Sequence, residues 1–182
     1  MLQNIPISCG TNVGGLRHLQ LVRVEDVISI PAAVNSIVAT AISLRAGATM
    51  ATIQFPPQSA DFSEKEKESD IGAIINAQIR CDIPKDAPEL GKWANDNLEA
   101  EVIAIYADGN GTPVIVGDLE RPLQLHVSRG TGRKYADKNG MEIVVEGIST
   151  HYAYYYQMFE KLTPGNRNVY TAGYTFGYLR TP

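Results

Sequence analysis

The sequence is poor in the residues that most often build metal sites and disulfide frameworks. It has two cysteines, Cys9 and Cys81, and three histidines, His18, His126 and His151, among 182 residues. Two cysteines are too few for a disulfide scaffold, and no Cys-x-x-Cys pair is present to hold zinc. No two histidines have the spacing that would let them share a metal on one helix. We therefore expect neither a metal site nor a cofactor.

Basic charge and long apolar runs are also scarce. Sixteen Lys and Arg stand against 20 Asp and Glu, which gives a net charge of -4. Binding to a nucleic-acid duplex needs clustered basic residues, so the balance argues against such a surface. No apolar run approaches the roughly 18 residues of a membrane span, and the amino terminus lacks the basic start and apolar core of a signal peptide. We expect a protein that is made in a cytoplasm and has no membrane partner.

Recognisable catalytic motifs are missing as well. Residues 130–140 read GTGRKYADKNG, which suggests a phosphate-binding loop at first sight. That template requires Gly-Lys followed by Ser or Thr, whereas Gly132 precedes Arg133, Lys134 and Tyr135. A strand pattern follows it, where a nucleotide loop would open a helix. We interpret the segment as a connector between two strands.

The turn Asp108-Gly109-Asn110-Gly111 resembles a calcium loop only in part. Pro113 stands where that loop requires glycine, and Glu120 comes one position after the bidentate carboxylate place. Gly and Asn tolerate positive φ, so the segment is better interpreted as a tight turn. With no Gly-x-Ser-x-Gly elbow either, the sequence does not predict an enzyme.

What the sequence does have is alternation with a period of two. In residues 70–83 one face is apolar: Ile71, Ala73, Ile75, Ala77, Ile79, Cys81 and Ile83. The other face is mostly polar and carries Asn76, Gln78, Arg80 and Asp82, with Ile74 as the misfit. This pattern predicts a long, half-buried antiparallel strand.

Similar patterns predict further strands over 19–30, 37–45, 49–55, 101–106, 113–116, 123–128 and 141–146. Residues 87–98 break the rule, because Leu90, Trp93 and Leu98 have helical spacing behind Pro88. We expect one short helix whose Leu90 and Trp93 cover a sheet. The predicted fold is mainly β, a two-sheet antiparallel β-sandwich or partial barrel with one flanking helix. Residues 1–17 are expected to form an arm, 18–150 the domain, and 151–182 an aromatic arm or edge strands.

The stretch Ser63-Glu64-Lys65-Glu66-Lys67-Glu68-Ser69-Asp70 is the most highly charged part of the chain. One interpretation is a solvated hairpin tip, kept soluble by its mixed charges. The other is a loop that reaches a neighbouring subunit through complementary charge, using Glu64, Glu66 and Glu68. In that case Arg133 and Lys134 of another copy are candidate partners.

Aromatic residues concentrate at the carboxyl end. Seven of the nine tyrosines lie beyond residue 150, and Tyr suits surfaces that become dry on assembly. We consider two uses for them, packing between subunits and packing on the domain's own sheet. The candidate interface residues are Tyr152, Tyr154, Tyr155, Tyr156, Tyr174, Phe176 and Tyr178.

The order of strands and turns in residues 101–150 resembles virion structural proteins of tailed bacteriophages, in particular small tail proteins. The residues that carry the resemblance are turn residues: Gly117, Gly130, Thr131, Gly132, Asp137, Asn139, Gly140 and the pair Glu146-Gly147. The resemblance covers under a third of the chain and brings no catalytic residue. It implies a tail-tube-like fold with six copies in a ring, rings that stack, and a location in the virion.

Such a ring encloses a channel through which DNA passes without specific binding, and it contacts other tail or neck proteins. The polar face of residues 70–83, with Asn76, Gln78, Arg80 and Asp82, is then expected to face the channel. A β-sandwich binding module that recognises a glycan or a surface protein through exposed tyrosines is the alternative hypothesis.

Overall fold

The computed structural model describes residues 12–69, 72–132 and 139–159. This part of the chain is mainly β, with one α-helix and one 3-10 turn. The elements in chain order are β1 (Leu16–Arg23), η1 (Val24–Asp26), β2 (Val27–Ser29), β3 (Ile37–Val38), β4 (Ser43–Leu44), β5 (Ala51–Ile53), β6 (Ala60–Ser69), β7 (Gly72–Pro84), α1 (Pro88–Asp96), β8 (Glu101–Asp108), β9 (Pro113–Val116), β10 (Leu123–Gly130), β11 (Gly140–Ser149) and β12 (Tyr154–Tyr156).

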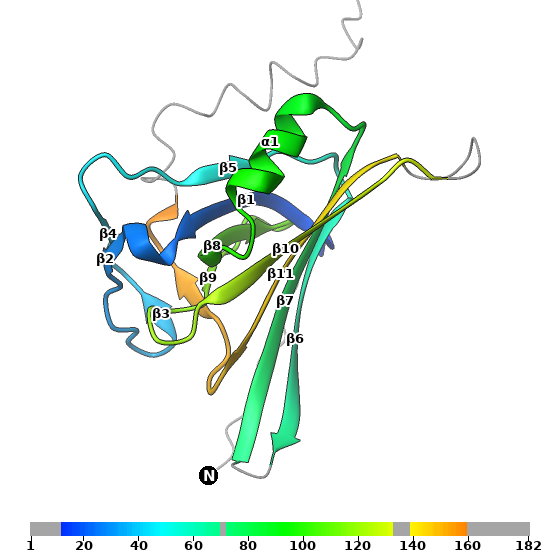
Figure 1. Cartoon of the computed structure of the whole chain (residues 1–182). Coiled ribbons are helices and arrows are strands. Elements are labelled where there is room, and N and C mark those ends of the chain that lie inside the picture. The colour runs from blue at the N-terminus through cyan, green and yellow to red at the C-terminus, as the bar shows by residue number, and fades with distance from the viewer. Residues whose placement is uncertain (1–11, 70–71, 133–138, 160–182) are drawn as a thin grey trace, which may run out of the picture.

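Ten strands form one sheet that divides at β8. The order is β3-β12-β9-β8-β10-β11-β7-β6, with β1 on the other edge of β8 and β5 beyond β1. β10 pairs with the start of β8, whereas β9 pairs with residues 104–107 farther along it. One wing (β10, β11, β7 and β6) and a second wing (β9, β12 and β3) therefore leave the same strand in different directions (Figure 1).

β8 is buried on both faces and separates two apolar cores. Val102, Ala104 and Tyr106 belong to the first core, which also contains buried residues of β1, β5, β7, β10 and β11. Ile103 and Ile105 belong to the second core, which is covered by parts of residues 27–50 and by Tyr156. The wing of β10, β11, β7 and β6 thus faces the β5-β1-β8-β9 layer across the first core, as the two sheets of a sandwich do. The predicted fold class is confirmed.

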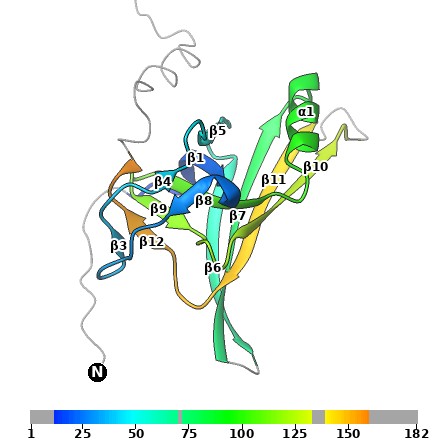
Figure 2. The same ribbon diagram turned by 60° about the vertical axis from the view of Figure 1, so that its left-hand side comes forward.

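The predicted helix is also confirmed. Leu90 and Trp93 of α1 pack against the first core. Asn97 ends the helix, because its side-chain amide donates to the Trp93 carbonyl at 2.8 Å. Arg23 of β1 donates to the Asp96 carbonyl and to Asn97 Oδ1, which ties the helix end to the sheet. α1 lies at the opposite end of the molecule from the projecting end of the β6–β7 hairpin (Figure 1, Figure 2).

Three strand predictions in the first third of the chain were confirmed only in part, because none of the predicted ranges is one continuous strand. The strand expected over 19–30 stops at Arg23. Arg23 pairs with Val102, the second residue of β8, so β8 offers almost no further residues with which β1 could pair. The chain turns through η1 and enters a separate two-stranded sheet of β2 and β4. Residues 37–45 and 49–55 form only the short strands β3, β4 and β5, because most of this segment covers the second core as irregular chain.

The limits of the folded body also differ from the predicted ones. The sheet begins at Leu16, and β12 lies between β9 and β3 inside it. The domain therefore extends a little beyond both predicted boundaries, 18 and 150. No helix in the described part of the chain has the length and apolar character needed to cross a membrane.

Candidate assembly surfaces

In the charged stretch 63–70, residues 63–69 belong to a strand, which corrects both the hairpin-tip and the loop interpretation for them, and Asp70 lies outside the described residues. This strand is β6, which pairs with β7 from Ala60↔Cys81 to Ser69↔Gly72. β11 covers the other side of β7 only as far as Ile75. Beyond that point two strands continue without a third described strand and project from the body (Figure 1).

The period of two in β6 sorts its charges by face. The inner face, on the side of the first core, carries Glu64, Glu66 and Glu68 opposite Ala77, Ile75 and Ala73. The outer face carries Lys65 and Lys67 opposite Asn76 and Ile74. Successive side chains of a strand point to opposite faces, so the sequence Glu-Lys-Glu-Lys-Glu gives the hairpin one acidic and one basic face.

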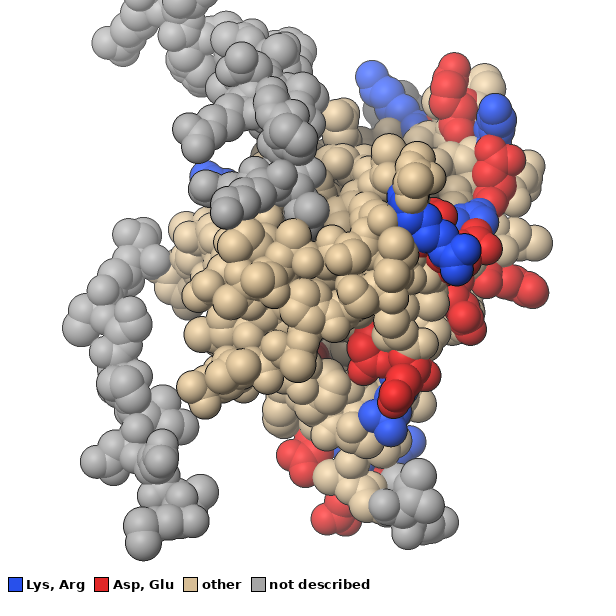
Figure 3. All heavy atoms as spheres, turned by 90° about the vertical axis from the view of Figure 1, so that its left-hand side faces the viewer, with Lys and Arg blue, Asp and Glu red and all other residues tan. Residues whose placement is uncertain are grey.

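A second surface is notable for its lack of charge. Residues 27–60 contain a single charged side chain, Arg45. The side of the molecule that this segment covers is almost free of Lys, Arg, Asp and Glu (Figure 3). Ile28 and Val34 are 60% and 69% exposed there. An exposed apolar surface of this kind is typical of a contact region, and the scarcity of charge in the sequence was the signal that could have predicted it.

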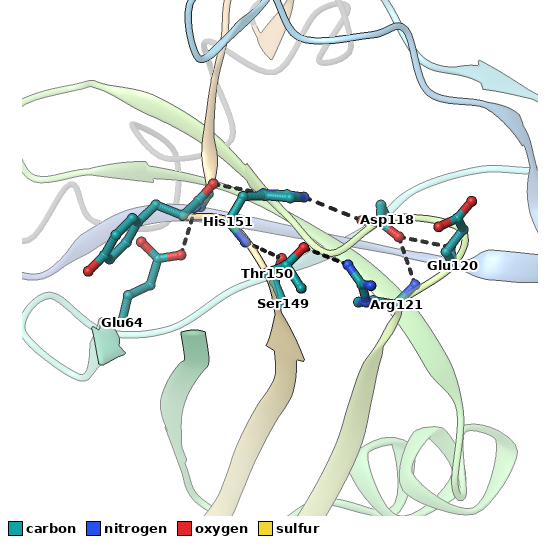
Figure 4. Close-up of polar contacts among 9 residues, drawn as sticks. Glu64, Asp118, Glu120, Arg121, Ser149, Thr150 and His151 are labelled. Atoms are coloured by element: carbon teal, nitrogen blue, oxygen red, sulfur yellow. Dashed lines mark hydrogen bonds and ion pairs between the residues drawn. The ribbon is translucent and has the colours of Figure 1, made fainter. Parts of the chain in front are cut away.

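The root of the hairpin is fixed by a polar cluster (Figure 4). Glu64 Oε1 accepts a hydrogen bond from the Ala153 amide at 2.7 Å. His151 Nδ1 lies 3.0 Å from the Tyr152 carbonyl, and its Nε2 lies 3.6 Å from Asp118 Oδ2. Asp118 Oδ1 in turn accepts the backbone amides of Glu120 and Arg121 at 2.8 and 2.7 Å. These contacts join β6 to the turn after β9 and to the turn after β11.

The same residues border a cavity of about 380 Å³. Its wall is largely apolar and includes Ile115, Leu123 and Ala153. Burial raises the pKa of Glu64, while the Ala153 amide and the nearby His151 oppose the rise. Sequence reasoning missed this cluster, because Glu64, Asp118 and His151 are far apart in the chain and form no linear motif.

The four residues expected to face a channel share one solvent-facing surface. Asn76 and Arg80 are exposed, and Gln78 and Asp82 are half-buried. Gln78 donates to Glu146 at 2.8 Å, and Arg80 Nε lies 3.2 Å from Glu142. The wing thus presents a polar face on which positive and negative groups are interleaved.

The tyrosines divide between the core and the surface. Tyr156 was expected at a subunit interface, but it is 0% exposed and belongs to the second core. Its hydroxyl accepts a hydrogen bond from the Ile42 amide at 3.2 Å. Tyr154 is half-buried and stacks on His151 at 4.4 Å. Tyr152 and Tyr155 are each 53% exposed, so they remain available to a partner.

The other predicted interface residues lie outside the described part of the chain: Arg133, Lys134, Tyr174, Phe176 and Tyr178. Arg133 and Lys134 belong to the connector between β10 and β11, which pair antiparallel up to Gly130↔Gly140. The interpretation of this segment as a link between two strands is therefore confirmed.

Comparison with protein-family models, with curated proteins and with solved structures finds no match. Within the described residues, no group of three or more His, Cys, Asp and Glu side chains is placed to hold a metal ion. A functional hypothesis therefore depends on the surfaces described above.

Proposed function

We propose that this chain is a structural protein of a bacteriophage tail, which oligomerises into rings that form or end the tail tube and enclose a passage for DNA. The observation that carries the proposal is the projecting β6–β7 hairpin. An isolated two-stranded hairpin is marginally stable in water. A hairpin that extends beyond its own sheet, as this one does past Ile75, gains stability when another chain covers it.

Two further features support self-association. In the described structure β6 pairs only with β7, so its other edge presents main-chain groups without strand partners. The charge-poor side with Ile28 and Val34 offers apolar contact area at a different place on the molecule. Two different surfaces are what a chain needs to contact neighbours on both sides of a ring.

The polar wing face suits the wall of a DNA passage. Glu142 and Glu146 stand among Arg80 and Gln78, and they pair with these groups across the sheet. Tight binding to DNA requires unopposed Lys and Arg to release counterions. Carboxylates on the same face oppose that binding, so DNA would slide past. Other tail or neck proteins would then bind at the ends of the stack, in the virion.

Electron microscopy of the purified chain tests the proposal. We expect rings, six-fold in symmetry, with the face of Gln78, Arg80 and Asp82 towards the lumen. Light scattering over a wide concentration range gives an independent measure of mass. A chain that stays monomeric at high concentration, with and without crowding agents, would contradict the proposal.

The exposure of Tyr152 and Tyr155 favours the alternative, a binding module for a glycan or a surface protein. Sugars stack on exposed aromatic rings. Replacing both residues by Ala would then abolish ligand binding by a folded monomer. In a ring-forming protein the same change would weaken assembly.

A further inference from the structure

Within the described part of the chain, the charges near the end of the hairpin lack salt-bridge partners. Lys65, Glu66, Lys67 and Glu68 are all exposed. Glu66 contacts the Tyr152 hydroxyl at a distance of 3.5 Å. Among the described residues, none of these four forms a salt bridge. Each face therefore holds like charges two residues apart, and these repel one another until an opposite charge is brought near.

A second copy of the same chain supplies both complements. The acidic face needs a basic surface, and the basic face needs an acidic one. A two-fold contact through the same face would put Glu66 and Glu68 against themselves, or Lys65 and Lys67 against themselves. Contact between the inner face of one hairpin and the outer face of the next satisfies all four groups. Such a head-to-tail contact repeats and closes into a ring when the rotation allows.

Pairing through the free edges of β6 is opposed by the same charges. Strands that continue one sheet place residues of the same face opposite each other. When two copies pair through β6 with their inner faces on the same side of the joined sheet, antiparallel pairing puts Glu opposite Glu and Lys opposite Lys. Like charges directly opposite each other destabilise the pair. Stacked sheets lie about 10 Å apart, a gap that long Lys and Glu side chains span.

We therefore propose, on the basis of the proposed function, that the hairpins of neighbouring copies stack face to face, with Glu66 and Glu68 of one copy against Lys65 and Lys67 of the next. Apolar side chains accompany the charges on each face. The exposed Ala73 lies opposite Glu68, and the half-buried Ile74 lies opposite Lys67. The contact thus explains why an isoleucine interrupts the polar face of β7.

Charge reversal tests this arrangement in the full chain. Three variants are compared with the wild type: E66K/E68K, K65E/K67E, and the four-fold swap that carries both changes. Glu64 is left unchanged, because it holds the hairpin root through Ala153. The control is E99K/E120K, which reverses two exposed carboxylates that form no salt bridge with another described residue. Circular dichroism and thermal melts verify that each variant folds.

We expect each double reversal to abolish rings in electron microscopy, and the swap and the control to form them. Equal amounts of the two double variants, mixed, are expected to assemble as well, because every contact then joins a basic hairpin to an acidic one. Raising the salt concentration weakens wild-type rings, since exposed charges are screened.

Other outcomes overturn the inference in distinguishable ways. If the wild type and both double variants all form rings, the hairpin contact is wrong and the proposed function stands. If the double variants fail and neither the swap nor the mixture restores assembly, the charges contact something other than the hairpin of a second copy. If the wild type forms no rings, the proposed function itself fails.

Discussion

Tyr156→Phe gives a direct test of the division between core and surface tyrosines. The substitution removes one oxygen atom and keeps the ring. Tyr156 is 0% exposed, and its hydroxyl is the partner that the structure gives to the buried Ile42 amide at 3.2 Å. Removal of the hydroxyl leaves that N–H group without its acceptor.

The expected cost follows from burial and bond length. A buried donor left unsatisfied costs about 1–3 kcal/mol. The 3.2 Å separation is at the long end of the normal range for a hydrogen bond, so we expect the lower part, about 1–2 kcal/mol. For a chain of this size, that corresponds to a fall in Tm of about 2–8 °C.

Urea unfolding followed by the fluorescence of Trp93 measures the difference, at a protein concentration where the chain is monomeric. Tyr155→Phe is the matched control, because it makes the same chemical change at a neighbouring side chain that is 53% exposed. We expect the control to lie within about 0.5 kcal/mol of the wild type. Equal stabilities for the two variants would show that the hydrogen bond between the Tyr156 hydroxyl and the Ile42 amide does not stabilise the fold, and would refute this reasoning.

Three further predictions test other parts of the structure. Burial raises the pKa of Glu64 above its ordinary 4.5, so its contribution to stability is present below pH 4.5 and is lost as the pH rises through the raised value. Glu64→Gln should therefore gain stability relative to the wild type between pH 4 and pH 7 in urea unfolding, and a change in the opposite direction would refute the sign. Burial raises the pKa of the fully buried Cys81 thiol to about 12. In a Cys9→Ser variant, a thiol reagent at pH 8 should therefore label Cys81 only as fast as the chain unfolds. Rapid labelling of the folded chain would contradict this prediction. At Gly140 a Cβ would lie 2.1 Å from the Ile83 carbonyl oxygen, whereas at its cross-strand partner Gly130 a Cβ would meet nothing within 4 Å. Gly140→Ala should therefore lower the free energy of unfolding by at least about 1–3 kcal/mol, as measured in thermal melts. Gly130→Ala is the control and should stay close to the wild type.

The sequence predicted best where one face of a strand meets a core and the other meets water. In β7 the buried residues Ile75, Ala77, Ile79 and Cys81 are those that the alternation selected. Burial of one face forces a period of two, so a local pattern suffices. The helix was predictable for a related reason, because Pro88 and the spacing of Leu90 and Trp93 are local signals.

Features that depend on distant partners could not be predicted in the same way. The alternating side chains of β8 are nearly all apolar, which indicates burial but does not say that two separate cores lie on its sides. The end of β1 at Arg23 depends on where β8 begins, about 80 residues later in the chain. Tyr156 and its exposed neighbour Tyr155 are the same residue type in one short strand, and the core that separates them is built from β2, β8 and β9.

The charged stretch 63–68 was misinterpreted because its composition was given more weight than its period. Mixed charges indicate solvent exposure, and exposure is shared by loops and by strands that leave a sheet. The alternation of Glu and Lys is itself a period of two, which is the pattern of a strand, and β7 supplies the partner. A loop of the same composition would mix its charges and would have no acidic or basic side. A strand separates them, and in the proposed ring a hairpin with opposite charges on its two faces would distinguish the copy ahead of it from the copy behind it. That directionality favours a ring over a two-fold dimer, and it follows from the backbone conformation of these residues as much as from their charges.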